Sequence, residues 1–336
     1  MSDFTKELIT RYGKFLLRPY TNEDEDAILK LWQLAFKKTL DKRIWRWKFH
    51  DNPFGREMML CVDRFEKPVV LFAGIPFPAQ WNMKKIIMTQ NIDNMSHPNY
   101  RYAVSGRRGL FIKTAEYYFD RLGNTNVNII HYGFPGLKHY KLGNILLNYK
   151  EIPVDKTYYE LSINKMRRKG LHFFCKVKLI DEFNEVFDVL WLSNRKYYPC
   201  SVVRDSKFLN WRFYRNPIND YHTFGLYNIK NKLRGYIVFL IKENSAIIVD
   251  IFSPNNRKEL NQLLFQSINK LKTHEIKKIK IWTPSHHFIA KSIVDFGFEC
   301  KKEPLGIVPA YKHFTGNNYL KHFNKFYYTM ADGDLF

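Results

Sequence analysis

The sequence predicts an α/β (α+β) protein made of two copies of one domain, each with a mixed, mostly antiparallel central sheet flanked by helices. The first observation is a repeated motif, W-[KR]-F-x-x-N-P, which occupies residues 47–53 and returns at 211–217, an offset of 211 − 47 = 164 residues. The second is chain length, because 336 residues suit two domains better than one. A repeat of about half a chain indicates a duplicated domain, since solenoid repeats are about 20–50 residues long.

The same succession of elements surrounds both copies of the motif. Apolar residues at helical spacing precede each copy, at 21–36 and at 183–191. Thr21, with Asp24 three residues later, is placed to cap the first of these helices. Two strands, a helix, a further strand and a glycine-bearing helical turn then follow in each half: 68–75, 85–93, 110–122, 127–132 and Gly143 in the first, and 233–241, 246–252, 258–271, 277–282 and Gly297 in the second. Each half therefore reads β, α, α, β, β, α, β, α, an order that predicts helices packed on a mixed sheet.

A polar stretch at 164–170 breaks both periodicities and marks the boundary between the copies. We therefore expect an N-terminal domain at 1–165, a C-terminal domain at 166–315 and an aromatic, acidic tail at 316–336. The tail is predicted to dock on the protein, because its aromatic side chains would otherwise be left in water. These side chains are Tyr319, Phe323, Phe326, Tyr327 and Tyr328.

Composition argues against several classes of protein. Hydrophobic residues make up 45% of the chain, enough for sizeable cores and too many for a disordered chain. The longest apolar runs are strand-sized and the N-terminal residues are polar, so we expect neither a membrane span nor a signal peptide, and a cytoplasmic location. The four cysteines form no C-x-x-C pair, which predicts reduced thiols and no metal site.

The charge balance is strongly basic, with 54 basic residues against 32 acidic ones and a formal net charge of +22. Such a field favours anionic partners: the phosphates of coenzyme A, an acidic acyl-carrier protein, a nucleic acid or an anionic membrane surface. Solvated lysine-rich faces explain the same excess equally well. A nucleic acid is the weakest of these partners, because the aromatic residues fall at core periodicities rather than along an exposed basic stripe.

Three local motifs follow one another in the first half. Residues 93–101 read D-x-x-x-H-P-x-Y-R, residues 105–111 read S-G-R-R-G-L-F, and residues 139–143 read H-Y-K-L-G. In this order they resemble the end of strand four, the pyrophosphate loop and the Y-x-K-L-G-F turn of the GNAT (Gcn5-related N-acetyltransferase) superfamily. The ending M-A-D-G-D-L-F at 330–336 is similar to the acidic tail of some tandem GNAT proteins. The resemblance implies two GNAT-like domains.

The resemblance also implies an acyl-CoA site in the first domain. A diphosphate needs main-chain N–H donors with no side chain in the way, which a glycine-bearing turn at the start of a helix supplies. Arginine adds bidentate contacts to phosphate, and in the family the backbone at the end of strand four pairs with the pantetheine arm. The implied binding residues are Met95, Ser96, His97, Arg101, Gly106, Arg107, Arg108, Gly109, Leu110 and Phe111. The matching stretch of the second half, 250–259, has no glycine, so we expect the second domain to be degenerate.

Acyl transfer needs a donor for the leaving thiolate and a base for the acceptor amine. The resemblance implies Tyr140 as the acid, with His139 as its rival, because the family tyrosine more often lies four residues before the glycine. His97 is a less favoured base, since no carboxylate partner is visible for it in the sequence. The candidate bases are Asp93, Asp332, Asp334 and the terminal carboxylate of Phe336.

We therefore expect a GNAT-type N-acyltransferase, most simply an acetyltransferase. It would move an acetyl or longer acyl group from acyl-CoA to an amine of a small molecule, an amino sugar or a protein. Two related alternatives stay open: transfer from an acyl-carrier protein, and peptide-bond formation from aminoacyl-tRNA, which also uses paired GNAT-like domains. An alternative of another class is a non-enzymatic nucleic-acid-binding protein.

Overall fold

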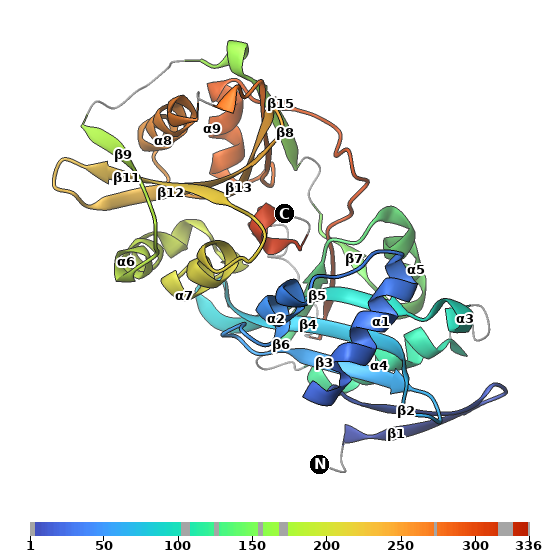
Figure 1. The fold of residues 1–336 in the computed structure, drawn as a ribbon. Helices are drawn as coiled ribbons and strands as arrows, with labels where there is room; N and C mark the ends of the chain where they lie inside the picture. The colour runs from blue at the N-terminus through green and yellow to red at the C-terminus, as the bar shows by residue number, and fades with distance from the viewer. Residues whose placement is uncertain are drawn as a thin grey trace. The chain divides into compact units, whose positions relative to one another are not determined.

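The computed structural model (Figure 1) describes residues 4–101, 108–123, 128–153, 157–167, 174–271, 274–314 and 325–334. The chain forms two compact units. The first unit consists of Met1–Pro78, Ile86–Glu151 and Ile307–Gly316, and the second of Ala79–Lys85, Ile152–Gly306 and Asn317–Phe336. Sequence patterns place the boundary at residue 165, whereas in the structure the chain leaves the first unit at Glu151 and returns to it for 307–316. The difference arises because residues 310–313 pair with strands at 130–133 and 150–151, and local sequence patterns do not predict such long-range pairing.

The first unit is built on one sheet with the strand order β1-β2-β3-β4-β5-β6-β16-β7. β5 and β6 run parallel, while the pairs β1–β2, β2–β3, β3–β4, β6–β16 and β7–β16 are antiparallel. The strands are β1 (Lys6–Thr10), β2 (Gly13–Pro19), β3 (Glu57–Val62), β4 (Pro68–Trp81), β5 (Lys84–Ser96), β6 (Asn128–Gly133), β7 (Lys150–Glu151) and β16 (Ala310–His313).

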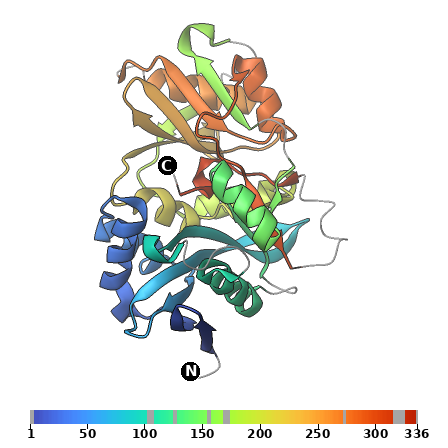
Figure 2. The same cartoon turned by 90° about the vertical axis from the view of Figure 1, so that its right-hand side faces the viewer.

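Helices cover both faces of this sheet. They are α1 (Glu25–Phe36), α2 (Lys42–Phe49), α3 (Pro98–Arg101), α4 (Leu110–Leu122) and α5 (Leu137–Leu147). Figure 2 shows α1, in blue, on the face of the sheet away from α4, in teal. α4 is amphipathic and buries Ile112, Ala115 and Tyr118 in one cluster with Phe15 and Phe72 of the sheet. The cluster fixes α4 on the sheet and therefore fixes where the helix begins.

The end of α5 differs from the predicted turn at Gly143. Gly143 lies inside the helix, which runs on to Leu147 and ends at Asn148 with a left-handed φ of 58°. A side chain at 143 would collide with the ring of Tyr149, so close packing explains a glycine in mid-helix. In the second half the predicted turn is present, because a helix ends at Gly297 with a φ of 123°.

The second unit is built on a sheet with the order β15-β8-β14-β13-β12-β11-β9. β13 and β14 run parallel and the other neighbours are antiparallel. The strands are β8 (Tyr158–Ser162), β9 (Cys175–Leu179), β11 (Tyr221–Asn228), β12 (Leu233–Lys242), β13 (Ser245–Phe252), β14 (Lys278–Trp282) and β15 (Glu299–Cys300). A short strand, β10 (Cys200–Val202), pairs with residues 79–81 at the end of β4, which belong to this unit.

Helices also cover both faces of the second sheet. Figure 1 shows α8 and α9 on one face and α6 and α7 on the other. The helices are α6 (Glu185–Asn194), α7 (Ser206–Leu209), α8 (Arg257–Lys270) and α9 (Phe288–Phe296), with a π-helical turn at Asn210–Tyr214 after α7. The repeated W-[KR]-F motif lies in α2 of the first unit and in this π-helical turn of the second. Its tryptophan and phenylalanine are buried in both copies. Each unit is thus a mixed, mostly antiparallel sheet flanked by helices, as predicted.

Candidate functional site in the first unit

The pairing between β5 and β6 stops before the end of β5. Their parallel pairing extends as far as Gln90, opposite Tyr132. β6 ends at Gly133, whereas β5 continues to Ser96, 96 − 90 = 6 residues beyond the pairing. When one strand of a pair runs on in this way, its main-chain groups leave the ladder, and an extended ligand can pair with them as an added strand does.

The last part of β5 bends at Asp93, whose φ of 55° is left-handed. For a residue with a side chain this conformation costs about 1–2 kcal/mol. The Asp93 carboxylate is held by Lys48 of α2, whose Nζ lies 3.2 and 3.0 Å from its two oxygens. The two side chains are only 3% and 10% exposed, so each charge compensates the other in the interior. Asp93 therefore anchors the bend, and to act as a base it must give up its contact with Lys48.

The connection after β5 is fixed by His97 and Arg101. The Nδ1 atom of His97 accepts a hydrogen bond from the N–H of Asn99 at 3.3 Å, and burial and the nearby Arg101 lower the pKa of His97. The Nε atom of Arg101 donates to the main-chain oxygen of Ser96 at 3.1 Å, and its Nη2 atom donates to the Ala35 oxygen at 3.2 Å. Arg101 thus ties the end of β5 to the end of α1.

α4 begins beside this connection. Gly106 and Arg107 of the predicted pyrophosphate loop lie outside the described residues, and Arg108 is exposed. Gly109 is the N-cap residue, with an extended backbone (φ −63°, ψ 143°). The N–H of Lys113 makes a helical hydrogen bond to the Gly109 oxygen at 2.9 Å, so the amides between them have no acceptor within the helix. The helix N-terminus therefore offers donors and a positive dipole end to an anion.

Leu110 and Phe111 contribute to this end through their main chain. Leu110 is 2% exposed, and Phe111 packs against the same core, with its ring 5.7 Å from that of Phe72. Both side chains point into the protein, which leaves only their amides to face a ligand. The apolar residues after Gly109 thus anchor the start of the helix.

The two candidate acids lie side by side in sequence on α5. His139 is exposed and Tyr140 is partly exposed. Within the described part of the chain, the Tyr140 hydroxyl makes no hydrogen bond to another residue. α5 follows the end of β6 after a three-residue connection, 134–136, and its N-cap is Gly136, whose oxygen accepts from the N–H of Tyr140 at 3.0 Å. Both candidates therefore lie on α5, the helix that follows β6.

The acidic tail belongs to the second unit. Asp332 is 1% exposed, and its Oδ2 atom lies 2.5 Å from Arg204 Nη2. Asp334 is exposed, and Phe336 lies outside the described residues. Asp332 is therefore engaged in a buried ion pair, which removes it from the candidate bases. The predicted docking of the tail is present in its last described part, since Phe326, Tyr327 and Tyr328 are fully buried.

Two cations with evident structural roles were missed by sequence reasoning. Lys48 is the basic residue of the first W-[KR]-F motif, so its recurrence as Arg212 in the second copy was an available signal. Arg204 lies on no periodic face and in no motif, and nothing in the sequence singles it out.

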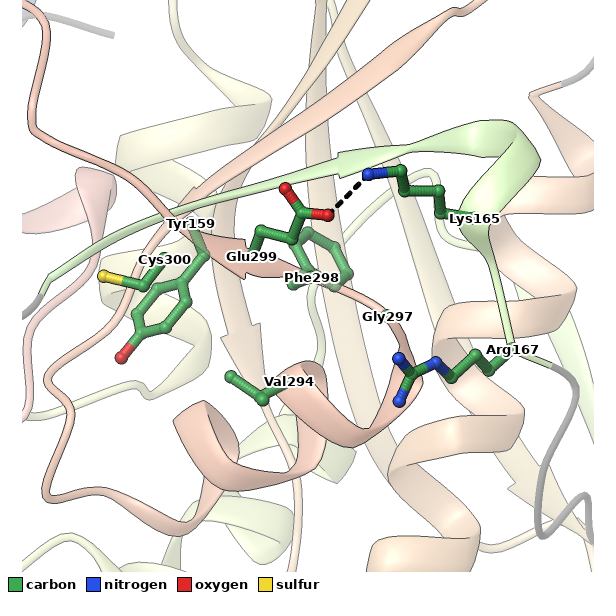
Figure 3. A pocket seen from close by; sticks show the side chains of 8 residues that line it. All are labelled: Tyr159, Lys165, Arg167, Val294, Gly297, Phe298, Glu299 and Cys300. Carbon is green, nitrogen blue, oxygen red and sulfur yellow. Dashed lines mark hydrogen bonds and ion pairs between the residues drawn. The ribbon is translucent and has the colours of Figure 1, made fainter.

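A separate pocket of about 820 Å³ opens at the edge of the second sheet. Figure 3 shows Lys165 paired with Glu299, at 2.7 Å, above a floor that includes Tyr159 and Phe298, with Arg167 beside Gly297. None of the residues predicted for acyl-CoA binding or catalysis lines it. The pocket lies at the edge strand β15 of the second sheet.

In the ranges that the structure describes, no three His, Cys, Asp or Glu side chains are grouped to hold a metal ion. No helix in those ranges is long and apolar enough to cross a membrane.

Comparison with known proteins identifies the fold. Neither a protein-family model nor a curated protein matches the sequence. Among solved structures, a GCN5-related N-acetyltransferase from Anabaena variabilis matches 89% of this chain and 72% of its own at 12% identity and a TM-score of 0.68. A probable N-acyltransferase from Enterococcus faecalis V583 matches over the same shares at 13% identity and a TM-score of 0.64. The Saccharomyces cerevisiae N-myristoyltransferase with bound myristoyl-CoA matches 93% of this chain and 84% of its own at 9% identity and a TM-score of 0.60. The predicted tandem GNAT-like fold is confirmed.

Proposed function

We propose that this chain, which has the fold of the GCN5-related N-acetyltransferases, transfers an acyl group from acyl-CoA to an amine. One observation carries the proposal: β5 runs on beyond its pairing with β6, and α4, which follows it after α3, begins after Gly109 with no side-chain cap. An extended amide-bearing arm fits the first feature and a diphosphate fits the second. Coenzyme A joins these two chemical groups in one molecule.

In the proposed complex the pantetheine arm pairs with the main chain of Met95 and Ser96, beyond the bend at Asp93. The diphosphate meets the amides at the start of α4 through the loop that contains Gly106 and Gly109. Arg107 and Arg108 add bidentate contacts to its oxygens. The Lys48–Asp93 pair has a positioning role, because it sets the course of β5 where the thioester would lie.

In the proposed reaction the acceptor amine attacks the thioester carbonyl, so that a C–N bond forms and the C–S bond breaks. The amine gives up a proton to a base, and the leaving thiolate takes one from the Tyr140 hydroxyl, with His139 as the alternative donor. Asp93 and Asp334 are the proposed bases, and separate substitutions decide between them. The acceptor class, an amino sugar, another small amine or a protein, stays open in this proposal.

Thermal melting with acetyl-CoA, longer acyl-CoAs and free CoA tests the proposal. A ligand that binds the folded state raises the melting temperature, and saturation at about 100 times Kd stabilises by about 2.7 kcal/mol. We expect a shift with at least one CoA species, and the species that gives the largest shift identifies the donor class. Absence of a shift with every species contradicts the proposal and favours the acyl-carrier-protein, aminoacyl-tRNA or nucleic-acid alternatives.

A matched pair of variants places the site. Arg108→Glu puts a negative charge beside the start of α4 and should lower acyl-CoA affinity at least 10-fold. Arg215→Glu makes the same change at an exposed arginine of the second unit and should leave the affinity unchanged. Equal effects of the two variants would show a general charge effect and would count against the site at α4.

A further inference from the structure

In the second unit, too, one of two parallel strands runs on beyond the end of their pairing. β13 pairs with β14 only as far as Ile248, opposite Ile281, and then continues to Phe252. The sequence around the strand end is also alike: D-I-F-S-P at 250–254 spans the end of β13, and D-N-M-S-H-P at 93–98 spans the end of β5. We call the place where β13 runs on beyond its pairing with β14 the second cleft, because it corresponds to the place in the first unit where β5 runs on beyond β6.

The chain itself occupies this second cleft. The Tyr327 hydroxyl donates to the Ile251 oxygen at 2.5 Å. The Tyr198 hydroxyl donates to the Ser253 oxygen at 2.7 Å and accepts from the Ser253 N–H at 2.9 Å. These main-chain groups lie at the end of β13 and just after it, beyond its pairing with β14, and a pantetheine arm would need groups of this kind. The rings of Tyr198 and Tyr327 also pack against His287 at the start of α9, at 4.9 and 4.3 Å.

A buried network of ion pairs and hydrogen bonds holds the C-terminal segment, residues 325–334, in place. Arg204 lies 3.2 Å from Asp250 of β13 and 2.5 Å from Asp332 of the segment. The Thr329 hydroxyl donates to Asp250 at 2.8 Å, and the Tyr236 hydroxyl donates to it at 2.7 Å. Each of these five side chains is at most 1% exposed. Undocking the segment would break the Arg204–Asp332 ion pair and the Thr329–Asp250 hydrogen bond in a buried site, so the network favours the docked segment.

The backbone of the segment is held as well. Arg212, the basic residue of the second W-[KR]-F motif, donates to the oxygens of Ala331 and Gly333 at 3.0 and 3.1 Å. The N–H of Tyr327 donates to the Cys200 oxygen of β10 at 2.8 Å. The corresponding Lys48 of the first unit instead holds Asp93 on its own β5. The basic residue of the motif thus binds β5 in the first unit, as Lys48, and the C-terminal segment in the second unit, as Arg212.

We propose that the second cleft is a peptide-binding site whose resident ligand is the C-terminal segment, and that this occupancy closes the cleft to acyl-CoA. The chain then binds one acyl-CoA, in the first unit. The count of bound CoA rests on the proposed function, whereas the occupancy by peptide does not. Tyr327 supplies the strand-edge contact of the resident peptide, and Asp332 supplies its charge contact.

Native mass spectrometry with saturating acetyl-CoA and myristoyl-CoA counts the bound molecules. We expect one per chain, and a lower occupancy for Arg108→Glu when the ligand concentration is reduced to near the Kd of the unchanged chain. Two per chain, or one that persists in Arg108→Glu and is lost on substitution of Arg257 at the start of α8, overturns the inference. If neither ligand binds at all, the proposed function fails, and the peptide experiment decides the inference alone.

The peptide experiment uses a chain that ends at residue 324 and a synthetic peptide of residues 325–336. We expect the peptide to bind in trans and to raise the melting temperature, and a peptide with Asp332→Asn to bind at least 10-fold more weakly. A peptide with Asp334→Asn is the control, because Asp334 is exposed and should bind as the unchanged peptide does. Equal binding of all three peptides overturns the inference.

If the shortened chain does not fold, the full chain gives the same answer. Carboxypeptidase releases C-terminal residues only from an undocked segment. Release past residue 332 should be at least 10-fold faster in Asp332→Asn than in Asp334→Asn. Equal release rates would show that the Arg204 contact does not hold the segment and would overturn the proposal.

Discussion

At the scale of single residues, buried charges in the first unit are compensated by named partners. Asp93 takes a left-handed conformation near the end of β5, and Lys48 of α2 holds its carboxylate. A strained residue kept in place by a buried ion pair is typical of a site where the course of the backbone matters. The pair therefore offers a direct test of how the bend in β5 is maintained.

Substitution of Lys48 by methionine should lower the free energy of unfolding by about 3–5 kcal/mol, because it removes the cation that compensates the buried Asp93 carboxylate. The double variant Lys48→Met/Asp93→Asn should recover most of this loss, since asparagine tolerates the left-handed conformation and carries no charge. Urea denaturation of the three proteins measures the effect. Lys42→Met is the control: Lys42 pairs with Glu25 but is 44% exposed, so its loss should cost about 1 kcal/mol or less.

Glu57 is a second partly buried acid of the first unit, and its partners are neutral. It accepts hydrogen bonds from Thr89, Tyr118 and Asn128 at 3.0, 3.1 and 2.9 Å. Burial raises the pKa of Glu57 in spite of these hydrogen bonds. A carboxyl whose folded pKa is raised binds its proton more tightly in the folded state, so its contribution to stability falls as the pH rises from its unfolded pKa of about 4.3 through the folded value.

We therefore expect Glu57→Gln to reduce the loss of stability on going from pH 4.5 to pH 6.5. Glutamine cannot ionise, and its oxygen still accepts hydrogen bonds. Urea denaturation at pH 4.5, 5.5 and 6.5 compares the slopes of the two proteins. Glu116→Gln, at a half-exposed position of α4, should keep the slope of the unchanged chain; a slope that is the same for all three proteins contradicts the assignment.

At the scale of elements, α5 shows why local rules fail in places. A glycine after apolar helical residues predicts a helix end, because glycine weakens a helix interior by about 1 kcal/mol relative to alanine. In α5 the packing of Tyr149 against Gly143 outweighs this preference, and the helix continues for another turn. The cap is supplied by Asn148, a residue that enters the left-handed region more readily than most.

Gly143→Ala should therefore destabilise the protein by about 1–3 kcal/mol, the usual cost of overpacking, although the same change in an open helix stabilises it. Gly136→Ala is the matched control on the same helix, because nothing lies within 4 Å of a Cβ at that position. The control should cost about 1 kcal/mol or less. Thermal or urea denaturation separates the two outcomes, and a neutral Gly143→Ala would mean that Tyr149 moves aside.

At the scale of the whole molecule, the duplicated architecture could be predicted from sequence because its signal is repeated. The W-[KR]-F motif and the order of elements recur, and both units have the predicted mixed sheet. The borders of the units could not be predicted, because β16 pairs across a long stretch of chain and the C-terminal segment docks far from its neighbours in sequence. The start of α4 was identified from Gly109, whereas Arg204 was not, since a single buried cation leaves no periodic trace.

The net charge of +22 leads to a prediction for the whole molecule. If the field of the protein attracts the phosphates of acyl-CoA, affinity should fall severalfold between 50 and 300 mM NaCl, because salt screens charges beyond about 10 Å at 0.1 M. Isothermal titration calorimetry at the two salt concentrations measures the change. Sucrose at equal osmolality should have no such effect. An affinity independent of salt would assign the excess charge to solvated faces alone.

The position of β16 between β6 and β7 has a consequence for folding during synthesis. The first sheet can be closed only after residue 313 has left the ribosome, when the whole of 152–306 has already been made. Until then β6 displays an uncovered edge that is able to recruit a wrong partner. Domains usually fold in order from the N-terminus during synthesis. Here the second unit can form most of its sheet before β16 completes the sheet of the first unit.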